Sequence, residues 1–435
     1  MCAGDNLFAI FIFESAQLKK KYYLCIQKED DLMGDKMSIA IIGAGAAGCF
    51  CAINLKRMLP EADIHIFESK GKALAKVAVT GGGRCNLTNT FNKVKNLQEV
   101  YPRGEKLMRR ALTVFSAEDT CAWFEREGVR LVTQEDECIF PQSQDAMQIV
   151  NTLLYDIKCL NIQLHLNEKV THIDLNKWNR VIVTTGGHAT PAGFSMLEAL
   201  SIPIEQPVPS LFTFNVSGDW HQLLMGTVVE DVQAFIPGTK FRSRGALLLT
   251  HWGMSGPAAL KLSSYAARYL AEHDYLTPLC INWMGESSEQ EVRQLLQDMM
   301  QQHAQKLITS VYPQQFTSKH WGVLLTRMGI PLTQRWGTLN TKHLNRMLTV
   351  LTSDTYQITG KCPFKEEFVT CGGVSLKAIN INTLQSKQYP NLYFAGEVLD
   401  VDAVTGGFNL QAAWSMGYVV AKHIFTSYQT NNQKT

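Results

Sequence analysis

Three glycines near the start of the chain have the spacing of a dinucleotide-binding turn. The Gly-x-Gly-x-x-Gly motif begins at Gly43, after the apolar run 38–42 that predicts a strand and before the pattern over 46–58 that predicts a helix. Its glycines permit a tight turn, let the backbone approach a pyrophosphate, and allow close helix–strand packing. The helix N-terminus would face the phosphates with free N–H groups. The residues predicted to hold them are Gly43, Gly45, Ala46, Ala47 and Gly48.

An acidic residue ends the next predicted strand, at 63–67. Glu68 lies 20 residues after the third glycine, where an acid binds the hydroxyls of an unphosphorylated adenosine ribose, as in FAD or NAD. Ser69 follows it. Val170 lies in the alternating segment 162–174 that predicts strands, and by resemblance to two-dinucleotide-binding flavoproteins it is at the position whose backbone usually contacts adenine. The alternative is an ordinary strand–helix–strand unit with a glycine turn.

A second glycine-rich segment, 79–89, combines backbone freedom with short polar side chains. Such a loop can approach a flavin or a phosphate closely and donate several N–H groups. Arg84 can pair with a pyrophosphate or a substrate carboxylate, whereas a surface turn is the alternative for the whole segment. Cys85 is interpreted as a packed structural cysteine rather than a redox thiol, because no resolving cysteine lies nearby in the sequence. The cofactor-binding candidates here are Gly82, Gly83, Arg84, Cys85, Asn86 and Thr88.

Segments much later in the chain are typical of the flavin end of such a site. The apolar strand that begins at Val181 ends at the Thr-Gly-Gly turn 185–187, and a Phe-Ala-Gly-Glu run ends at Glu397. A helix is predicted from the Gly406–Gly407 pair to about 425, with its N-terminus beside the flavin N1/O2 edge, where its dipole would stabilise reduced flavin. The candidates are Thr185, Gly186, Gly396, Glu397, Asp400, Asn409, Leu410 and Gln411.

The chain between these ends changes character after Pro191. Short β-branched runs between 211 and 283 predict strands, and mixed polar–apolar patterns over 286–307 and 341–351 predict helices. The predicted fold class is α/β: a Rossmann-like FAD-binding domain with an inserted β-barrel-like domain and a small helical domain. The predicted units are an N-terminal extension (1–36), the FAD-binding domain (37–190 and 361–427), a β-rich substrate domain (191–285), a helical domain (286–360) and a tail (428–435).

Composition narrows the class of protein further. The 435 residues are 46% hydrophobic and 18% charged, with a net charge of +2, which gives no nucleic-acid footprint. Eleven cysteines without a C-x-x-C pair favour reduced thiols in a cytoplasmic protein and no metal site. No apolar run is long enough to span a membrane, and no signal peptide is recognised. The expected partner is a small-molecule substrate, and the oligomeric state is not readable.

The ordered motifs together resemble the bacterial BaiN/RdsA-type NAD(P)/FAD-dependent oxidoreductases, which include aminoacetone oxidase-like flavoproteins. The motifs are Gly-Gly-Gly-Arg-Cys-Asn-x-Thr-Asn (81–89), Thr-His-x-Gly-x-Ser-Gly-Pro (250–257) and Phe-Ala-Gly-Glu-x-x-Asp (394–400) with Thr-Gly-Gly-Phe-Asn-Leu-Gln (405–411). The resemblance covers almost the whole chain after Met37 and implies a Rossmann-like domain interrupted by barrel-like and helical domains, with non-covalent FAD. One departure is the shortened segment 188–194, where the family usually carries a longer loop with Tyr-Pro and Gly-Asp-Gly.

The leading functional prediction is an FAD-dependent oxidoreductase that transfers a hydride through flavin N5. The resemblance implies either NAD(P)H-driven reduction of an activated C=C bond or oxidation of an amino ketone by O2. Because the one dinucleotide fingerprint serves FAD, NAD(P)H would dock transiently as the electron donor. A flavin-containing RNA-modifying or RNA-binding protein is the alternative from another class. Catalytic side chains stay unassigned, with His251 and Arg84 as candidates.

Overall fold

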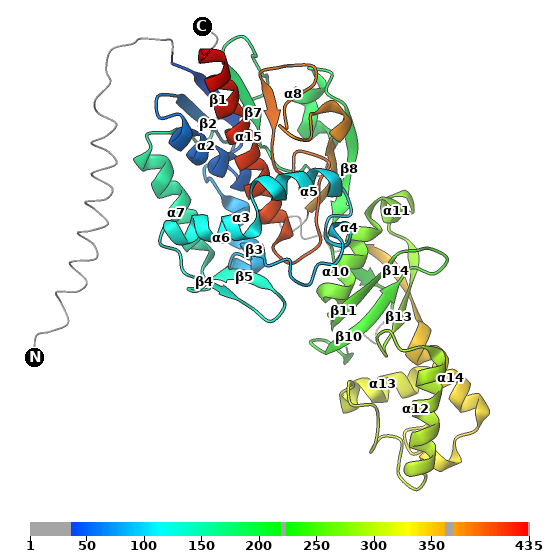
Figure 1. Cartoon of the computed structure of the whole chain (residues 1–435). Helices are drawn as coiled ribbons and strands as arrows, with labels where there is room; N and C mark the ends of the chain where they lie inside the picture. The colour runs from blue at the N-terminus through cyan, green and yellow to red at the C-terminus, as the bar shows by residue number, and fades with distance from the viewer. Residues whose placement is uncertain (1–35, 189, 219–222, 362–368, 434–435) are drawn as a thin grey trace, which may run out of the picture.

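A five-stranded parallel sheet forms the centre of the first domain. The computed structural model describes residues 36–188, 190–218, 223–361 and 369–433 (Figure 1). The strand order is β16-β7-β1-β2-β6, so the strand that leads into the glycine motif is central. Its four residues Ile39 to Ile42 are all buried, as expected for an apolar strand covered on both faces. The strands are β1 (Ser38–Ile42), β2 (Asp63–Phe67), β6 (Gln163–His165), β7 (Arg180–Val183) and β16 (Leu392–Phe394).

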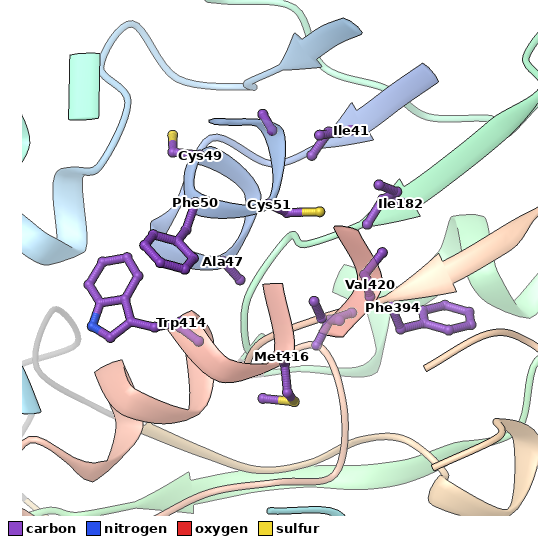
Figure 2. Close-up of a cluster of buried hydrophobic side chains, with 14 of the residues drawn as sticks. Ile41, Ala47, Cys49, Phe50, Cys51, Ile182, Phe394, Trp414, Met416 and Val420 are labelled. Atoms are coloured by element: carbon purple, nitrogen blue, oxygen red, sulfur yellow. The ribbon is translucent and has the colours of Figure 1, made fainter. Parts of the chain in front are cut away.

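Two helices from opposite ends of the chain pack together against this sheet. They are α2 (Ala46–Met58) and α15 (Phe408–Asn432). Figure 2 shows their shared apolar cluster, in which the rings of Phe50 and Trp414 lie 5.3 Å apart between centroids. Gly417 permits the close approach, because a Cβ there would lie 2.8 Å from the Ala47 carbonyl oxygen. The beginning and the end of the sequence therefore build one core.

Further elements of this domain surround the sheet. A small antiparallel sheet has the order β3-β5-β4, and β8 pairs with β15 in a separate antiparallel ribbon. The helices are α3 (Ala75–Gly83), α4 (Leu97–Val100), α5 (Glu105–Val114), α6 (Ala117–Arg126), α7 (Ala146–Cys159), α8 (Ser195–Glu198), η1 (Pro191–Phe194) and η3 (Leu376–Ala378). The strands are β3 (Thr88–Asn89), β4 (Leu131–Thr133), β5 (Cys138–Pro141), β8 (Ile204–Ser210) and β15 (Val369–Val374).

A closed antiparallel barrel forms the second part of the structure and has its own core. Its strand order is β10-β11-β12-β9-β14-β13, which confirms the predicted barrel-like insertion. Pro257 lies in the first turn of α10, where a proline is well tolerated. The strands are β9 (Phe214–Val216), β10 (Val228–Phe235), β11 (Arg242–Leu249), β12 (Gly253–Ser255), β13 (Thr277–Asn282) and β14 (Asp354–Lys361), and the helices are α10 (Gly256–Tyr265) and α11 (Ala267–Glu272).

The helical lobe is the segment between β13 and β14, and it extends from the barrel on the side away from β1 (Figure 1). It contains α12 (Glu289–Gln302), α13 (Ser318–Met328), η2 (Trp336–Thr338) and α14 (Thr341–Ser353). The prediction that 286–360 is helical is wrong at its C-terminal end. Residues 354–358 pair with β13 and close the barrel, so the helices are an insertion within the barrel.

The structure describes the predicted C-terminal tail in part and the predicted N-terminal extension only at its last residue. The tail 428–435 is wrong in part, because α15 continues to Asn432, with no glycine or proline to end it and with Thr430 Oγ1 donating to the Thr426 carbonyl. The extension predicted for 1–36 lies outside the described residues except for Lys36. The remaining domain boundaries stay a prediction. Within the described ranges, no helix is both long enough and apolar enough to cross a membrane.

Candidate functional site

The turn between β1 and α2 has the geometry that the glycine motif predicts. Gly43 has φ +111°, and a Cβ there would lie 2.4 Å from the Thr184 carbonyl oxygen. A Cβ on Gly48 would lie 2.1 Å from the Gly43 oxygen, so the helix can approach the turn only with glycine. By contrast, a Cβ on Gly45 would meet nothing within 4 Å. The protein therefore leaves the Gly45 side open, as approach of a pyrophosphate requires.

The N-terminus of α2 is also open electrostatically. Gly45 is its N-cap, no side chain accepts from the first-turn N–H groups, and the first turn carries no acid. Ala46 and Ala47 occupy this turn. Free N–H groups and the helix dipole favour an anion at this position.

Glu68 lies directly beside the glycine turn. Its Oε2 accepts from the Ala44 N–H at 3.0 Å, and its Oε1 accepts from the Lys70 N–H at 2.9 Å. Ser69 Oγ also donates to Oε1, at 3.2 Å. The backbone of Glu168 donates to the Glu68 carbonyl, which brings the segment containing the half-buried Val170 to the same edge of the sheet. This arrangement agrees with an adenosine end at the carboxyl ends of β1, β2 and β6.

The three consecutive glycines adopt a left-handed backbone that other residues rarely adopt. Gly81, Gly82 and Gly83 have φ between +61° and +82°, and they interrupt the helical geometry at the end of α3. Added Cβ atoms on Gly82 and Gly83 would meet nothing within 4 Å, so this turn is open on its outer side. Arg84 is exposed, donates from Nε to the Gly81 carbonyl at 3.2 Å, and lies over the Phe140 ring at 4.6 Å. No substrate role is assigned to it by these contacts.

Cys85 is fully buried, and this burial raises the pKa of its thiol to about 12. A thiol with such a pKa is protonated at neutral pH and is a poor nucleophile. Burial and the raised pKa agree with the interpretation as a packed structural cysteine. No disulfide joins any of the cysteines within the described residues.

The polar side chains at the start of α15 are occupied by the protein itself. Gln411 is fully buried, and its Oε1 accepts from the Thr88 and Thr120 hydroxyls at 2.5 and 2.9 Å. Its Nε2 donates to the Ser116 carbonyl and the Ser415 hydroxyl. The Asn409 amide is bonded at 2.9 Å to both the N–H and the carbonyl of Ala403.

These amides therefore hold the loop and the helix in place. The backbone at the start of α15 is different, because its N-cap Gly407 leaves the first turn without a side-chain cap and without an acid. A Cβ on Gly407 would lie 2.4 Å from the Thr88 oxygen and 2.7 Å from Asn86 Oδ1. The motif 86–88 thus lies against the N-terminus of α15, and Leu410 is half-buried in its first turn.

Glu397 connects three segments of the site. Its Oε1 accepts from the Thr370 N–H at 2.9 Å, and its Oε2 forms an ion pair with Lys76 at 2.9 Å. Gly187 leaves room for the same carboxylate, because a Cβ at this position would lie only 2.7 Å from Oε1. Neighbouring Gly396 has φ +82°, and a Cβ on it would lie 2.9 Å from Ala47 Cβ. Residues predicted from both ends of the chain are therefore brought together.

Two polar atoms beside Glu397 are buried without a hydrogen-bond partner among the described residues. They are Thr185 Oγ1 and His188 Nε2. Burial and the nearby Lys76 lower the pKa of His188. With the open turns at Gly45 and Gly82 and the two uncapped helices, these features fit a large polar cofactor such as FAD. Gly186, between the two residues, has φ +76° and lies close to Glu397 Oε2.

A buried ion pair that sequence reasoning missed lies within the first domain, and its arginine also bonds the inserted part. Arg103 bonds the Asp402 carboxylate through both Nε and Nη2, and donates to the Ser264 carbonyl at 2.7 Å. Ser210 Oγ donates to the same carboxylate at 2.8 Å. Burial raises the pKa of nearby Asp400, whose carboxylate lies 3.4 Å from the Arg268 guanidinium. Spacing in the sequence gives no signal for partners that are 299 residues apart.

His251 lies apart from these contacts. It is exposed after β11, with its ring 4.1 Å from that of Trp252. None of the described contacts joins it to the segments around Glu397 or Gly407, so its role as a proton donor stays a prediction. Lys76, Thr370 and His188, in contrast, line the site without having been predicted.

The family model for the HI0933-like protein Rossmann domain matches residues 37–423. The chain belongs to the HI0933-like family. This is the BaiN/RdsA-type flavoprotein family that the motifs indicate, so the chain is an FAD-dependent oxidoreductase.

Curated relatives match this HI0933-like chain over nearly their whole length. A ribosomal RNA dihydrouridine synthase of Haemophilus influenzae is 27% identical over 88% of this chain and 97% of its own. The enzyme of the same name from Escherichia coli is 26% identical, and the match covers 90% of this chain and 99% of that enzyme. A 3-dehydro-bile acid delta(4,6)-reductase of Clostridium scindens is 23% identical, and the match covers 88% of this chain and 98% of that enzyme.

Solved flavoenzyme structures are more distant. The 3-ketosteroid delta1-dehydrogenase of Sterolibacterium denitrificans superposes with a TM-score of 0.46 at 9% identity, covering 91% of this chain and all of that one. A flavocytochrome c3 fumarate reductase gives a TM-score of 0.40 at 13% identity, covering 94% of this chain and 81% of that one.

Proposed function

We propose that this HI0933-like protein uses NAD(P)H to reduce a carbon–carbon double bond conjugated to a carbonyl group. The observation that carries the proposal is the shared chemistry of three full-length relatives. A dihydrouridine synthase saturates the conjugated double bond of a uracil ring, and a bile acid delta(4,6)-reductase saturates conjugated double bonds of a 3-oxo steroid. The substrates differ greatly, but the bond that is reduced is of one kind.

Bound FAD would supply the hydride chemistry through flavin N5. The chain's own residues would bind and orient it: the first turn of α2 at the pyrophosphate, Glu68 at the adenosine ribose, and the N-terminus of α15 at the flavin N1/O2 edge. The Lys76–Glu397 ion pair would fix the loop between these two ends. His251 and Arg84 stay candidates for handling the substrate proton or a substrate carboxylate.

NAD(P)H would dock transiently rather than in a domain of its own. Among the sheets of the described residues, only that containing β1 is parallel, and its glycine turn is assigned to FAD. The donor would therefore have to reach the flavin from the substrate side.

A second candidate is narrower: the reduced bond belongs to a base in ribosomal RNA. The two relatives that are 26–27% identical both carry that activity in their names. The alternative activity is oxidation of an amino ketone by O2, in which electrons flow from the substrate to the flavin. None of these three relatives is named as such an oxidase.

Anaerobic stopped-flow spectroscopy tests the proposal directly. We expect the flavin band of the purified protein to bleach on mixing with NADH or NADPH, and to recover without oxygen on adding a simple enone such as 2-cyclohexenone or an unmodified ribosomal RNA transcript. Recovery with RNA and formation of dihydrouridine would support the narrower candidate. Absence of bleaching, with hydrogen peroxide formed from aminoacetone in air, would refute the reductase.

A further inference from the structure

The helical lobe contains a long stretch with no acidic residue. Residues 299–353 include neither Asp nor Glu, although the whole chain has a net charge of only +2. The rest of the chain is therefore net acidic, so positive charge is concentrated in residues 299–353 although the total charge is near neutral. The basic residues of the stretch are Lys306, Lys319, Arg327, Arg335, Lys342 and Arg346.

All six of these side chains are exposed. Arg327 forms an ion pair with Asp354, and Arg335 donates to the Gln305 carbonyl. The other four have no ion pair with any described residue. Their positive charge is therefore available to a partner.

Two of the four lie on one face of α14. Lys342 and Arg346 are four residues apart, so their side chains are neighbours on the helix surface. From α12, Arg293 Nη1 reaches Asn345 Oδ1 at 3.4 Å, although its Nη2 also pairs with Glu289. We call Arg293, Lys342, Asn345 and Arg346 the α14 patch.

The charges of the α14 patch do not serve the stability of the helix. Lys342 lies in the first turn, which contains no acid, and a cation there opposes the helix dipole. Lys342 and Arg346 also repel each other at their i, i+4 spacing. Both effects oppose formation of the helix, so helix stability does not explain why these two residues are basic.

The lobe also lies far from the flavin-binding segments, beyond the barrel (Figure 1). A small substrate at the flavin would not touch it, whereas a macromolecule could occupy both places. Exposed Lys and Arg beside Asn side chains are typical of phosphate contacts, which position a nucleic acid without reading its sequence.

We propose that the α14 patch docks the phosphate backbone of a structured RNA, one base of which is presented to the flavin. This deepens the second candidate function and rests on it. The near-neutral total charge predicts no nucleic-acid partner, and the positive charge of residues 299–353 is the reason to revise that prediction.

The test is RNA binding by the full-length holoprotein, measured by fluorescence anisotropy with a labelled transcript of a ribosomal RNA hairpin and loop. The variant K342Q/R346Q should weaken binding at least about tenfold at low salt. It should also reduce the slope of log affinity against log salt by about 1.5, because each lost phosphate contact removes roughly 0.7–0.9.

The matched control is K106Q/R110Q on α5 of the first domain. These two residues are also exposed, also four positions apart on a helix, and also outside the ion pairs of the described residues. This control should bind RNA like the unaltered protein. Both variants should keep the unaltered melting temperature to within a few degrees, because the side chains removed are exposed.

The outcomes separate the docking surface from the proposed reaction. RNA binding that is weakened only by K342Q/R346Q supports the surface, whether or not NAD(P)H bleaches the flavin. Equal weakening by both variants, equal affinity for duplex DNA, or no salt-dependent RNA binding would overturn it. Binding of phosphatidylserine vesicles without binding of RNA would overturn it in favour of a membrane surface. Bleaching of the flavin reports on the reductase alone.

Discussion

Helices α2 and α15 both begin at a glycine without a side-chain cap, yet the residues around their first turns differ. At α2 the surrounding side chains are small, and the Gly45 backbone faces open space. At α15 the motif amides of Asn409 and Gln411 are bonded to the protein. One end of the predicted FAD site therefore offers exposed backbone, whereas at the other end the polar motif residues hold the backbone in place.

The largest expected effect is at the α2 end. Gly48→Ala would place a Cβ 2.1 Å from the Gly43 oxygen and 2.5 Å from Thr184 Oγ1, so the turn must move. We expect a loss of stability on the order of 3 kcal/mol and loss of FAD binding, measured by thermal unfolding of the apoprotein and by flavin fluorescence.

Gly45→Ala is the matched substitution in the same turn. Its Cβ meets no protein atom within 4 Å, so the apoprotein should melt as the unaltered protein does, while FAD affinity falls. Unchanged FAD affinity in Gly45→Ala would show that the pyrophosphate does not approach this backbone.

A smaller effect is expected at the α15 end. Gln411→Met removes the amide that bonds the buried Thr88 and Thr120 hydroxyls and the half-buried Ser116 carbonyl. The Thr120 hydroxyl and the Ser116 carbonyl still bond each other at 3.1 Å, so the main loss is at Thr88. Loss of this buried partner should destabilise the protein by about 1–2 kcal/mol. Denaturant unfolding should give the same loss with and without FAD. A loss confined to the FAD-bound form would mean that the Gln411 side chain contacts the flavin, and the contrast between the two ends would fail.

The smallest expected effect concerns Cys85, which precedes the motif lying against α15. Because burial raises its pKa to about 12, Cys85 carries little thiolate at pH 8. Iodoacetamide at that pH should leave Cys85 unmodified and label the exposed Cys159, as peptide mass spectrometry would reveal. Rapid labelling of Cys85 in the folded protein would reopen a redox role for this thiol.

Local patterns predicted the local elements well. The bounds of β1, α2 and β2 agree with the sequence reading, because the apolar periodicity and glycine chemistry that define them lie within a few residues. The barrel and the two-part FAD-binding fold were also predictable, in part from the resemblance. Between 162 and 174, however, the alternating pattern yields only the strand at 163–165, since the residues that follow form turns.

The contacts that organise the site were much harder to predict. Lys76 and Glu397 are 321 residues apart, and nothing in their local sequence indicates that they pair. Likewise, the polar motif at 409–411 predicts a flavin contact equally well whether its amides face the cofactor or the protein interior. That choice depends on Thr88 and Thr120, which reach Gln411 from segments about 300 residues earlier.

The packing of α15 on α2 has a consequence for the order of events during synthesis. The N-terminal segment is made first, and Phe50 on α2 can pack early against Phe115 and Trp123, but its contact with Trp414 forms only after that residue has left the ribosome. Strand β16, at the edge of the same sheet, is also among the last elements made. The barrel has its own core and can fold while the rest is still being translated. Loss of a short C-terminal segment would therefore leave a folded middle flanked by an apolar, cofactor-free beginning.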